Sequence, residues 1–529
     1  MICVVSQCKA LSLVLFDTPD NIELVRYPNA RRPENFNLLQ NGDVDVLVEP
    51  ISHTMGRDVY HPAVQSGLAF SVPFLYSGGV FIGVTTFVDC AEQLDTFTGD
   101  CRDLKVCTLI GSTYERALVD LLPGGIVVPH SGLEDVNAKL ANGTCNVVMG
   151  MDLFDSPGHH PTEDFEKVGF KLGTKVFSFE VLSLVTREND LEWSSLVNLV
   201  VNAFVSADAA DMTQENASLD TVAQYLPNSP KLAHIISSII SHFGNYGNLL
   251  EKYFAPYGSR IRAINDVYST SHHNTSGGGL LRSVPFGDIT ARGPAPAAGS
   301  TLQTIIDRGY LLCGVRPRMG FAYLESNATA TAAATSWAGF DVEFCQSLAA
   351  AIFRGNKTQV KFVNASSSSD DDSSTTTMYT LLANGAVDVV AGARVTLEAG
   401  FLEPTTNRSY KFSIPYFYDQ VEDDTNRLDA YALMTRNNDP IWSDFVYWIV
   451  MGLIYAEENQ MNSTSSTQMP VVSLFGENLK QMFRDCIYAM GSYGDIYSRN
   501  LESMVPRTGG PNMLNKGMGE ALQYPIPFS

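Results

Sequence analysis

The sequence predicts an α/β fold that occurs twice in one chain, and two observations support this. Short apolar strands alternate with helices along residues 301–391, as in sheets that are covered by helices. Several blocks of the first half also recur in the second half in the same order. The chain therefore contains an internal repeat, and each copy is expected to form a similar sheet.

The alternation begins with two elements at the start of the second copy. Residues Thr301–Val315 predict a short helix, a stop at Gly309 and then a strand. The next helix is expected to begin at Asp341, because aspartate is a good N-cap. Apolar residues at helical spacing give this helix one apolar face, and they are Val342, Cys345, Leu348, Ala349 and Ile352.

Two strands and one helix complete the pattern. Val360–Val363 is expected to be a strand. Met378–Gly385 predicts a helix that ends at its glycine. Val387–Gly392 is short and apolar, as buried parallel strands are. The order of these elements is that of an α/β sheet.

Four pairs of segments define the repeat. They are Leu38–Val48 with Leu381–Ala391, Phe70–Tyr76 with Phe412–Tyr418, Leu184–Trp193 with Leu433–Trp442, and Phe243–Leu249 with Met490–Ile496. The residue numbers differ by 343 and 342 in the first two pairs, but by 249 and 247 in the last two. The second copy therefore lacks about 93 residues that the first copy has between Tyr76 and Leu184.

The apolar stretch Met1–Phe16 looks like the front of an export signal, but the repeat favours another interpretation. When Cys8 is placed on Cys345, the stretch aligns with the apolar helix of the second copy. It also lacks a basic n-region and a small-residue cleavage site. We therefore expect a core helix here. On this alignment the first copy lacks the counterpart of residues 301–337, and any export signal is expected upstream of the chain.

Composition argues against several classes of function. The formal net charge is −22, which disfavours binding to nucleic acid or to anionic membranes. No apolar run reaches the roughly 18–20 residues of a membrane span, and the nearest, Ile441–Tyr455, contains Asp444. Triplets for N-glycosylation, for example at Asn142 and Asn216, weakly favour a secretory route and a glycoprotein.

No sequence motif indicates a cofactor or a metal. The chain has no P-loop, GxSxG or HExxH, and its cysteines show no CxxC spacing. The doublets His159–His160 and His272–His273 have no supporting carboxylate cluster. We therefore expect no cofactor, no metal site and no enzymatic activity.

Several blocks of both copies resemble one known family. In the second copy they are "RGYLLCGV", "GFDVEFCQSLAAAIF", "LLANGAVDVV", "FSIPYFYD", "TRNNDPIW" and "GSYGDI". This order resembles solute-binding protein family 3, and within it the general L-amino-acid-binding proteins of bacterial ABC transporters. The resemblance implies a type II periplasmic-binding fold, in which two three-layer α/β/α lobes close on one amino acid. Two crossing strands join the lobes.

The resemblance also implies how the two copies differ. The first copy is expected to be two-lobed but truncated at its N-terminus, and the second to lack most of lobe two. The implied segments are 1–77 (first copy, lobe one, incomplete), 78–182 (its lobe two), 183–256 (its return to lobe one and C-terminal helices), 257–300 (a linker), 301–420 (second copy, lobe one) and 421–529 (its return segment and C-terminal helices). The proposed linker is rich in Gly, Pro and Ser.

In the first copy, "ISHTMGRDV" (Ile51–Val59) matches the family's ligand motif in lobe one. The resemblance gives Arg57 the role of gripping the α-carboxylate of the ligand, which suits a bidentate guanidinium. Ser52 matches a polar contact of the family, and Thr54 lies between the two. The alternative for Arg57 is a solvated surface arginine.

The lobe-two part of the family's site matches Gly111, Ser112 and Thr113, which lie between a strand and a helix. Backbone N–H groups and hydroxyls at a helix start suit an anion, although a plain helix cap is the alternative. For the ammonium group of the ligand the family uses a carboxylate. Asp152 matches it with Asp155 as a rival, and a loop aspartate without function is the alternative.

The second copy departs from the ligand motif. Its matching stretch is "RVTLEAGF" (Arg394–Phe401), and Ala399 stands where the first copy has Arg57. Because it lacks the arginine and most of lobe two, we expect no ligand there. Phe321 and Arg394 remain candidates for a ligand contact.

The cysteines match the family in part. The resemblance implies two disulfides, Cys313–Cys345 and Cys107–Cys145, and Cys90 and Cys101 bracket an insertion that they could close. Disulfides fit an oxidising compartment. The remaining cysteines, expected to be unpaired, are Cys3, Cys8 and Cys486.

The resulting prediction is an extracytoplasmic solute-binding protein. The first copy is expected to capture a free L-amino acid, or a similar small zwitterion, for a membrane transporter or receptor, and not to bind nucleic acid. The alternative is a structural or interaction protein whose copies have decayed and bind no small molecule. A dehydratase-type enzyme on the same fold is less favoured, because the sequence offers no acid–base pair beyond the binding carboxylates.

Overall fold

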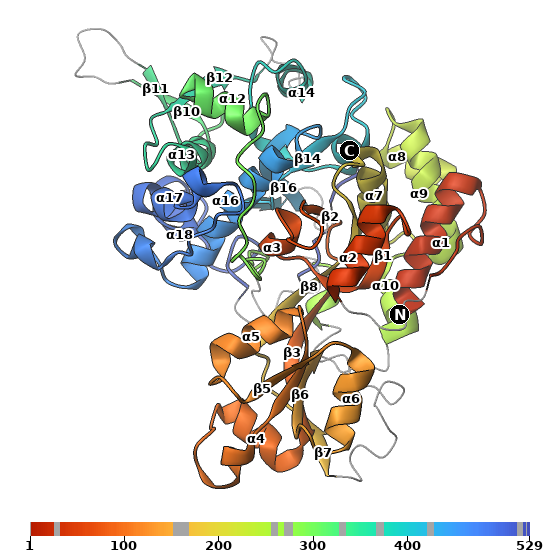
Figure 1. Cartoon of the computed structure of the whole chain (residues 1–529). Coiled ribbons are helices and arrows are strands. Elements are labelled where there is room, and N and C mark those ends of the chain that lie inside the picture. The colour runs from red at the N-terminus through yellow and green to blue at the C-terminus, as the bar shows by residue number, and fades with distance from the viewer. Residues whose placement is uncertain are drawn as a thin grey trace.

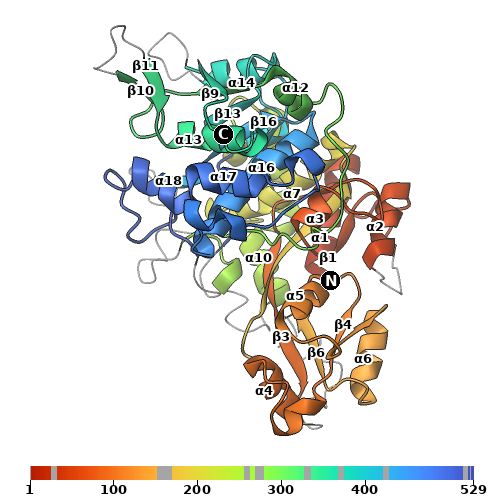
Figure 2. The same cartoon turned by 60° about the vertical axis from the view of Figure 1, so that its left-hand side comes forward.

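The structure is a computed structural model of the chain. It describes residues 2–25, 32–151, 169–254, 263–268, 279–326, 335–366, 375–420, 428–515, 522–524 and 526–528. Within these ranges, no helix has both the length and the apolar character that crossing a membrane requires. Figures 1 and 2 show the arrangement from two directions.

The first copy contributes the elements from α1 to α10. In chain order they are α1 (Ile2–Phe16), α2 (Arg32–Asn41), β1 (Leu47–Ser52), α3 (Met55–Asp58), β2 (Leu68–Phe70), β3 (Leu75–Val84), α4 (Thr85–Gln93), β4 (Val106–Leu109), α5 (Thr113–Leu121), β5 (Val127–His130), α6 (Leu133–Ala141), β6 (Val147–Met151), β7 (Phe170–Leu172), β8 (Ser178–Arg187), α7 (Leu191–Ala209), α8 (Leu219–Tyr225), α9 (Pro230–Phe243) and α10 (Tyr246–Phe254).

The second copy contributes the elements from α12 to α18. They are α12 (Thr301–Arg308), β9 (Leu311–Val315), β10 (Tyr323–Ser326), β11 (Thr335–Ala338), α13 (Phe340–Ile352), β12 (Val360–Asn364), α14 (Thr375–Ala383), β13 (Val389–Arg394), α15 (Leu397–Phe401), β14 (Tyr410–Phe412), β15 (Phe417–Gln420), β16 (Leu428–Arg436), α16 (Pro440–Glu458), α17 (Met482–Met490) and α18 (Tyr493–Asn500).

Two long strands connect the lobes of the first copy. β3 and β8, each of 10 residues, pair antiparallel from Leu75–Leu182 to Gly79–Ser178. In lobe one β8 continues beside β1 and β2, and in lobe two β3 continues beside β6 and β7. Figure 1 shows lobe two, with α4, α5 and α6, projecting away from the rest of the molecule.

The second copy has a single lobe. Its sheet has the strand order β12-β9-β13-β16-β14, with β15 beside β16. β15 and β16 correspond to β3 and β8, but only residues 421–427, which lie outside the described ranges, connect them. A hairpin therefore replaces lobe two. This confirms the predicted fold class, with a two-lobed first copy and a second copy that lacks most of lobe two.

The predicted start of the second copy is confirmed, with one correction. α12 ends before Gly309, whose φ of 80° is left-handed, and β9 follows. Asp341, however, is not an N-cap. Gly339 takes the cap position, and glycine is required there because its φ of 123° is positive and a Cβ would lie 2.4 Å from the Phe321 carbonyl oxygen. The Asp341 carboxylate turns inward and accepts a hydrogen bond of 2.7 Å from the Tyr416 hydroxyl.

The N-terminal stretch forms the expected core helix. Cys8, Ala10 and Leu11 of α1 are buried, and α1 packs against α7, α9 and α10. The Cys8 thiol is free, and burial raises its pKa to about 11. An uncharged, buried thiol behaves as a small apolar side chain.

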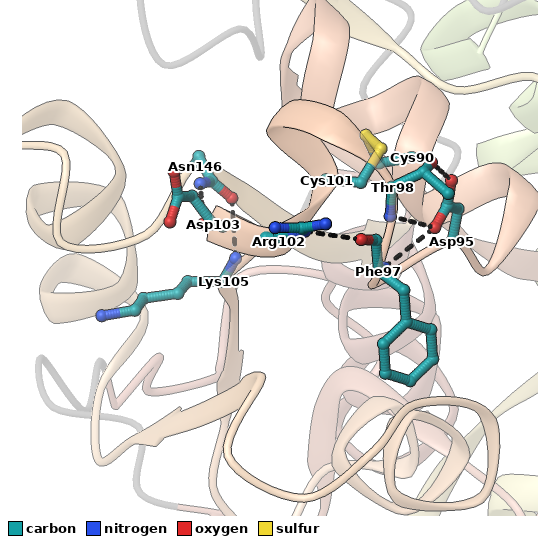
Figure 3. The surroundings of a disulfide bond; sticks show 9 residues. All are labelled: Cys90, Asp95, Phe97, Thr98, Cys101, Arg102, Asp103, Lys105 and Asn146. Carbon is teal, nitrogen blue, oxygen red and sulfur yellow. Dashed lines mark hydrogen bonds between the residues drawn. A yellow bond between two sulfur atoms is a disulfide. The ribbon is translucent and has the colours of Figure 1, made fainter.

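Three disulfides are present among the residues that the structure describes, and they are the expected pairs. They are Cys90–Cys101, Cys107–Cys145 and Cys313–Cys345. Figure 3 shows Cys90–Cys101, which ties α4 to the short 3-10 turn Gly99–Asp103. In the intervening loop the Asp95 carboxylate accepts hydrogen bonds from the N–H groups of Phe97 and Thr98, at 2.9 and 3.0 Å.

We call the paired strands β3 and β8 the hinge. One asparagine in each copy binds the backbone of β3, or of the corresponding strand β15, and so connects that strand to the C-terminal part of the same copy. Asn265 accepts from the N–H of Tyr76 at 2.7 Å and donates to its carbonyl at 2.8 Å. Asn512 makes the same two bonds with Tyr418, at 2.8 and 2.7 Å. The two asparagines differ by 247 in number, as the last repeat landmarks do, so the repeat extends this far.

The two copies exchange their C-terminal segments, which we call the first tail (279–288) and the second tail (the described residues 522–524 and 526–528). Leu281 of the first tail pairs with Leu514 of the second copy. Gln523 of the second tail pairs with Val267 of the first copy. Each tail therefore crosses to the other copy.

Beyond these pairs, each tail returns to the ligand motif of its own copy. The carbonyls of Pro285 and Phe286 accept from the first two N–H groups of α3, at 3.3 and 3.0 Å. The carbonyls of Pro527 and Phe528 accept from the first two N–H groups of α15, at 2.9 and 3.1 Å. The helix starts, which need such acceptors, are thus satisfied by the tails.

The first tail corrects the expectation of a linker over 257–300. Leu280, Leu281 and Val284 are buried, with exposures of 4%, 1% and 6%. Their apolar side chains fill the contact between the copies, and burial of this kind stabilises the packed state. The prediction of a linker rested on the glycines and serines of this region and overlooked these three apolar residues.

Two carboxylic acids interact where the copies meet, Glu188 after β8 and Asp444 in α16. Burial raises the pKa of Glu188 to about 7, and the nearby Asp58 adds to the rise. Burial, Asp58 and Glu188 together raise the pKa of Asp444 well above its ordinary value. The equivalent positions on the opposite side of the contact hold Asn437 and Ser195, joined by a neutral hydrogen bond of 3.1 Å.

We predict that this acid pair makes the protein less stable as pH rises. A folded-state pKa raised to about 7 means that the folded state holds a proton which the unfolded chain releases near its ordinary pKa of 4.5. The free energy of unfolding should therefore fall between about pH 5 and 8. Asp444→Ser, which installs the residue of the equivalent position, should flatten this dependence. Urea unfolding across that range measures it.

The control for this experiment is Asp100→Asn, at an exposed side chain of lobe two. This variant should keep the pH dependence of the wild type. If Asp444→Ser keeps it as well, the acid pair does not cause it.

Candidate functional site

The ligand motif of the first copy lies where β1 meets the hinge. β1 ends at Ser52, which pairs with Leu182 of β8. The N–H of the next residue, His53, donates to the Val181 carbonyl at 2.7 Å. The chain then turns into α3, whose start the first tail holds. The motif is thus fixed to the hinge on one side and to the tail on the other.

Arg57, on α3, reaches from lobe one to lobe two. Its side chain is buried, with 6% exposure. Nη1 donates to the Ser52 carbonyl at 2.8 Å, and Nη2 donates to the Gly111 carbonyl of lobe two at 3.1 Å. Its guanidinium also lies 5.8 Å from the ring centre of Phe36. Arg57 is therefore not a solvated surface arginine, and one guanidinium contacts both lobes.

The lobe-two turn lies between β4 and α5, as the sequence predicts. Gly111 has a left-handed φ of 72°. Ser112 is the N-cap of α5, and its Oγ accepts from the N–H of Glu115 at 3.1 Å. Thr113, the first residue of α5, donates from Oγ1 to the carboxylate of Glu180 at 2.8 Å. Ser112 thus caps the helix, while Thr113 turns to the hinge.

Glu180 is the residue that sequence reasoning missed. It lies on β8 opposite Ser77 and is only 1% exposed. Its carboxylate accepts hydrogen bonds from the hydroxyls of Ser52, Thr113 and Ser178, the last two at 2.8 Å. A carboxylate at the hinge therefore joins the lobe-one motif to the lobe-two turn.

The other predicted residues are placed differently or are not described. Thr54 is buried, its hydroxyl caps no helix N–H, and its side chain lies against Gly287 of the first tail. Asp152 and its rival Asp155 fall within residues 152–168, outside the described ranges. The structure thus brings together Ser52, Arg57, Thr113 and Glu180 around the lobe-two turn.

In the second copy the corresponding positions are filled by the protein's own side chains. Arg394, which takes the place of Ser52, pairs with Asp429 at 3.0 Å. Asp429 in turn takes the place of Glu180. Ala399, where an arginine would be needed, is buried. Phe321 is buried too, 4.0 Å beneath the guanidinium of Arg318.

The arrangement in the first copy suits a small zwitterion. A guanidinium, hydroxyls and N–H groups at the start of a helix stabilise a carboxylate. A buried carboxylate such as Glu180 stabilises an ammonium group, because both charges are then paired. In this structure the Arg57 donors are used by two backbone carbonyls, and a ligand would exchange with these contacts.

The described residues contain one group with the donor types of a metal site. Cys107, His130 and Cys145 have donor atoms within 4.8 Å of one another. The two cysteines form a disulfide, so their sulfur atoms offer no thiolate to a metal ion. The group therefore contains a structural disulfide of lobe two.

The family of the chain follows from its similarity to individual proteins of known function. No family model matches the chain. The glutamate/glutamine/aspartate/asparagine-binding protein BztA of Rhodobacter capsulatus is 34% identical over 308 residues, which cover 53% of this chain and 82% of BztA. The chain belongs to the family of amino-acid-binding periplasmic proteins of ABC transporters. The general L-amino acid-binding periplasmic protein AapJ of Rhizobium johnstonii is 33% identical over 113 residues, 21% of this chain and 28% of AapJ.

Solved structures of the same kind match about half of the chain. A periplasmic binding protein of an ABC transporter from Brucella ovis, with glutathione bound, has 21% identity and a TM-score of 0.38, covering 49% of this chain and 81% of that one. An ancestral arginine-binding protein bound to glutamine has 16% identity and a TM-score of 0.33, covering 48% and 87%.

We predict that Glu180 is needed to hold the lobes in register. Glu180→Leu leaves three hydroxyls without their acceptor, and it should lower the free energy of unfolding by about 2–4 kcal/mol. Glu180→Gln keeps an acceptor oxygen and should cost less than half as much. Urea unfolding of both variants measures this. Equal losses would show that the hydroxyl contacts contribute little.

Proposed function

We propose that the first copy captures a free L-amino acid, or a similar small zwitterion, between its two lobes. One observation carries the proposal: the buried Arg57 contacts both the ligand motif of lobe one and the turn of lobe two. A group bound there would be touched by both lobes at once, so its binding would favour the closed arrangement. The named relatives bind amino acids, which supports this proposal.

In the proposed complex each charged end of the ligand has its own partner. The α-carboxylate binds Arg57 and the turn Gly111–Thr113 at the start of α5. The ammonium group binds Glu180, with Asp152 as a further partner that the family resemblance suggests. Closure of the lobes then presents the loaded protein to a membrane transporter or receptor in an extracytoplasmic space.

The second copy supports a different proposal, that of a structural partner. Ala399 and the internal Arg394–Asp429 pair leave it neither the arginine nor an open acidic partner. We therefore propose that only the first copy binds a ligand. No enzymatic role is proposed, since the named relatives are binding proteins.

We predict that binding depends on Arg57. Isothermal titration calorimetry with the common L-amino acids should show saturable heat for at least one of them. Arg57→Ala should raise the Kd for that ligand about 100-fold, because losing one partner of a buried charge pair typically costs 2–5 kcal/mol.

Arg116→Ala is the matched control. This arginine lies on the surface of α5, paired with Asp120, with a side-chain exposure of 47%. Its removal should leave the Kd within about twofold, as surface ion pairs contribute little. A wild-type protein that binds none of the amino acids would refute the proposed function.

A further inference from the structure

The helix α3, which carries Arg57, also contacts the second copy through Asp58. Asp58, the neighbour of Arg57, accepts a hydrogen bond of 2.7 Å from the indole N–H of Trp448. Trp448 belongs to α16 of the second copy and is fully buried, and Asp58 is 7% exposed. Both views place α3 beside α16 (Figures 1 and 2). The residue next to Arg57 is therefore tied to the other half of the chain.

His53, the neighbour of Ser52, also contacts Trp448 and Asp58. Its ring stacks on Phe70 at 4.5 Å and meets the rings of Tyr447 and Trp448 at 5.6 and 5.7 Å. Its Nε2 lies 3.3 Å from the Asp58 carboxylate. Two aromatic residues of the second copy thus enclose one end of the ligand motif.

The first tail adds a third support. Phe286, whose carbonyl accepts from the N–H of Gly56, packs its ring against Tyr455 and Phe483 of the second copy at 4.8 and 5.1 Å. At Gly56 a Cβ would lie 1.8 Å from the carbonyl oxygen of Asp288, so only glycine lets the tail approach this closely. The tail therefore transmits the position of the second copy to the start of α3.

Comparison of the two copies shows that the Trp448–Asp58 hydrogen bond occurs only beside the ligand motif that contains Arg57. The tails satisfy the starts of both α3 and α15 in the same way. The position equivalent to Trp448 in the first copy, however, is Leu199, and the position equivalent to Asp58 in the second copy is Gly400. Neither can form the bond. The extra contact accompanies Arg57 and is absent beside Ala399.

We propose that the second copy is a fixed support for the ligand motif of the first, and that Trp448 is a positioning residue which orients Arg57 through Asp58. This inference rests on the proposed function, because its value lies in the geometry that Arg57 offers to a ligand. It gives the second copy a role in binding although that copy holds no ligand.

The test compares two tryptophans of the same helix in the full chain. Trp448→Phe removes the N–H donor to Asp58 and keeps an aromatic ring. Trp442→Phe is the matched control, because Trp442 is equally buried and donates to the Asp388 carbonyl at 2.9 Å within the second copy. Both variants should lose thermal stability to a similar extent.

Only Trp448→Phe should weaken ligand binding. We expect its Kd for the amino acid that the wild type binds to rise about 3- to 30-fold, the range of coupling through positioning contacts. Trp442→Phe should stay within about twofold. Equal Kd values for the two variants would overturn the proposal, since loss of stability alone would then account for both.

Hydrogen exchange of the ligand-free protein separates this inference from the proposed function. In Trp448→Phe the N–H groups of Met55–Val59 should exchange faster than in the wild type, and in Trp442→Phe they should not. Unchanged exchange would overturn the support role. If the wild type binds no amino acid, the proposed function fails, while this measurement still decides whether Trp448 holds α3. If Trp448→Phe does not fold, Asp58→Ala, which removes the acceptor of the same bond, replaces it in both measurements.

Discussion

The two tails hold the halves of this molecule together, because each tail pairs with the other copy before it returns to its own. Leu281 and Gln523 make these crossed pairs. The carbonyls that follow them satisfy the first N–H groups of α3 and α15. A helix start left without such acceptors would carry a large penalty in a buried site. The position of the ligand motif therefore depends on contacts between the copies.

The hinge is the second element on which the site depends. β3 and β8 carry Ser77 and Glu180 side by side, so the carboxylate sits where the lobes meet. From there it reaches the hydroxyls of Ser52 in lobe one and Thr113 in lobe two. In the second copy the same strand position holds Asp429, which pairs with Arg394. Both copies thus place an acid at the hinge and differ in what that acid contacts.

The sequence predicted the features that local patterns encode and missed those that depend on packing between the copies. The alternation of elements and the missing lobe were predictable from the apolar pattern and the repeat. The disulfides Cys107–Cys145 and Cys313–Cys345 were implied by the family resemblance, and Cys90–Cys101 by the insertion that the two cysteines bracket. Glu180 was not found, because one acid in an apolar strand gives no local signal, although aligning it with Asp429 would have marked the position. The tail exchange was hidden for another reason. The sequence of Leu280–Val284 does not reveal which copy its apolar residues contact, because that depends on tertiary packing.

Carrying both copies on one chain also changes how they find each other. Residues 289–300 connect the first tail to α12, and a short connection of this kind keeps two partners at an effective concentration on the order of millimolar. Their pairing is therefore an intramolecular step that dilution does not reverse, whereas two separate chains joined only by crossed tails would dissociate as their concentration falls. A fused pair can also lose the ligand residues of one member without losing the pair. The second copy shows this combination, because it has Ala399 in place of the ligand arginine and still packs against the first copy.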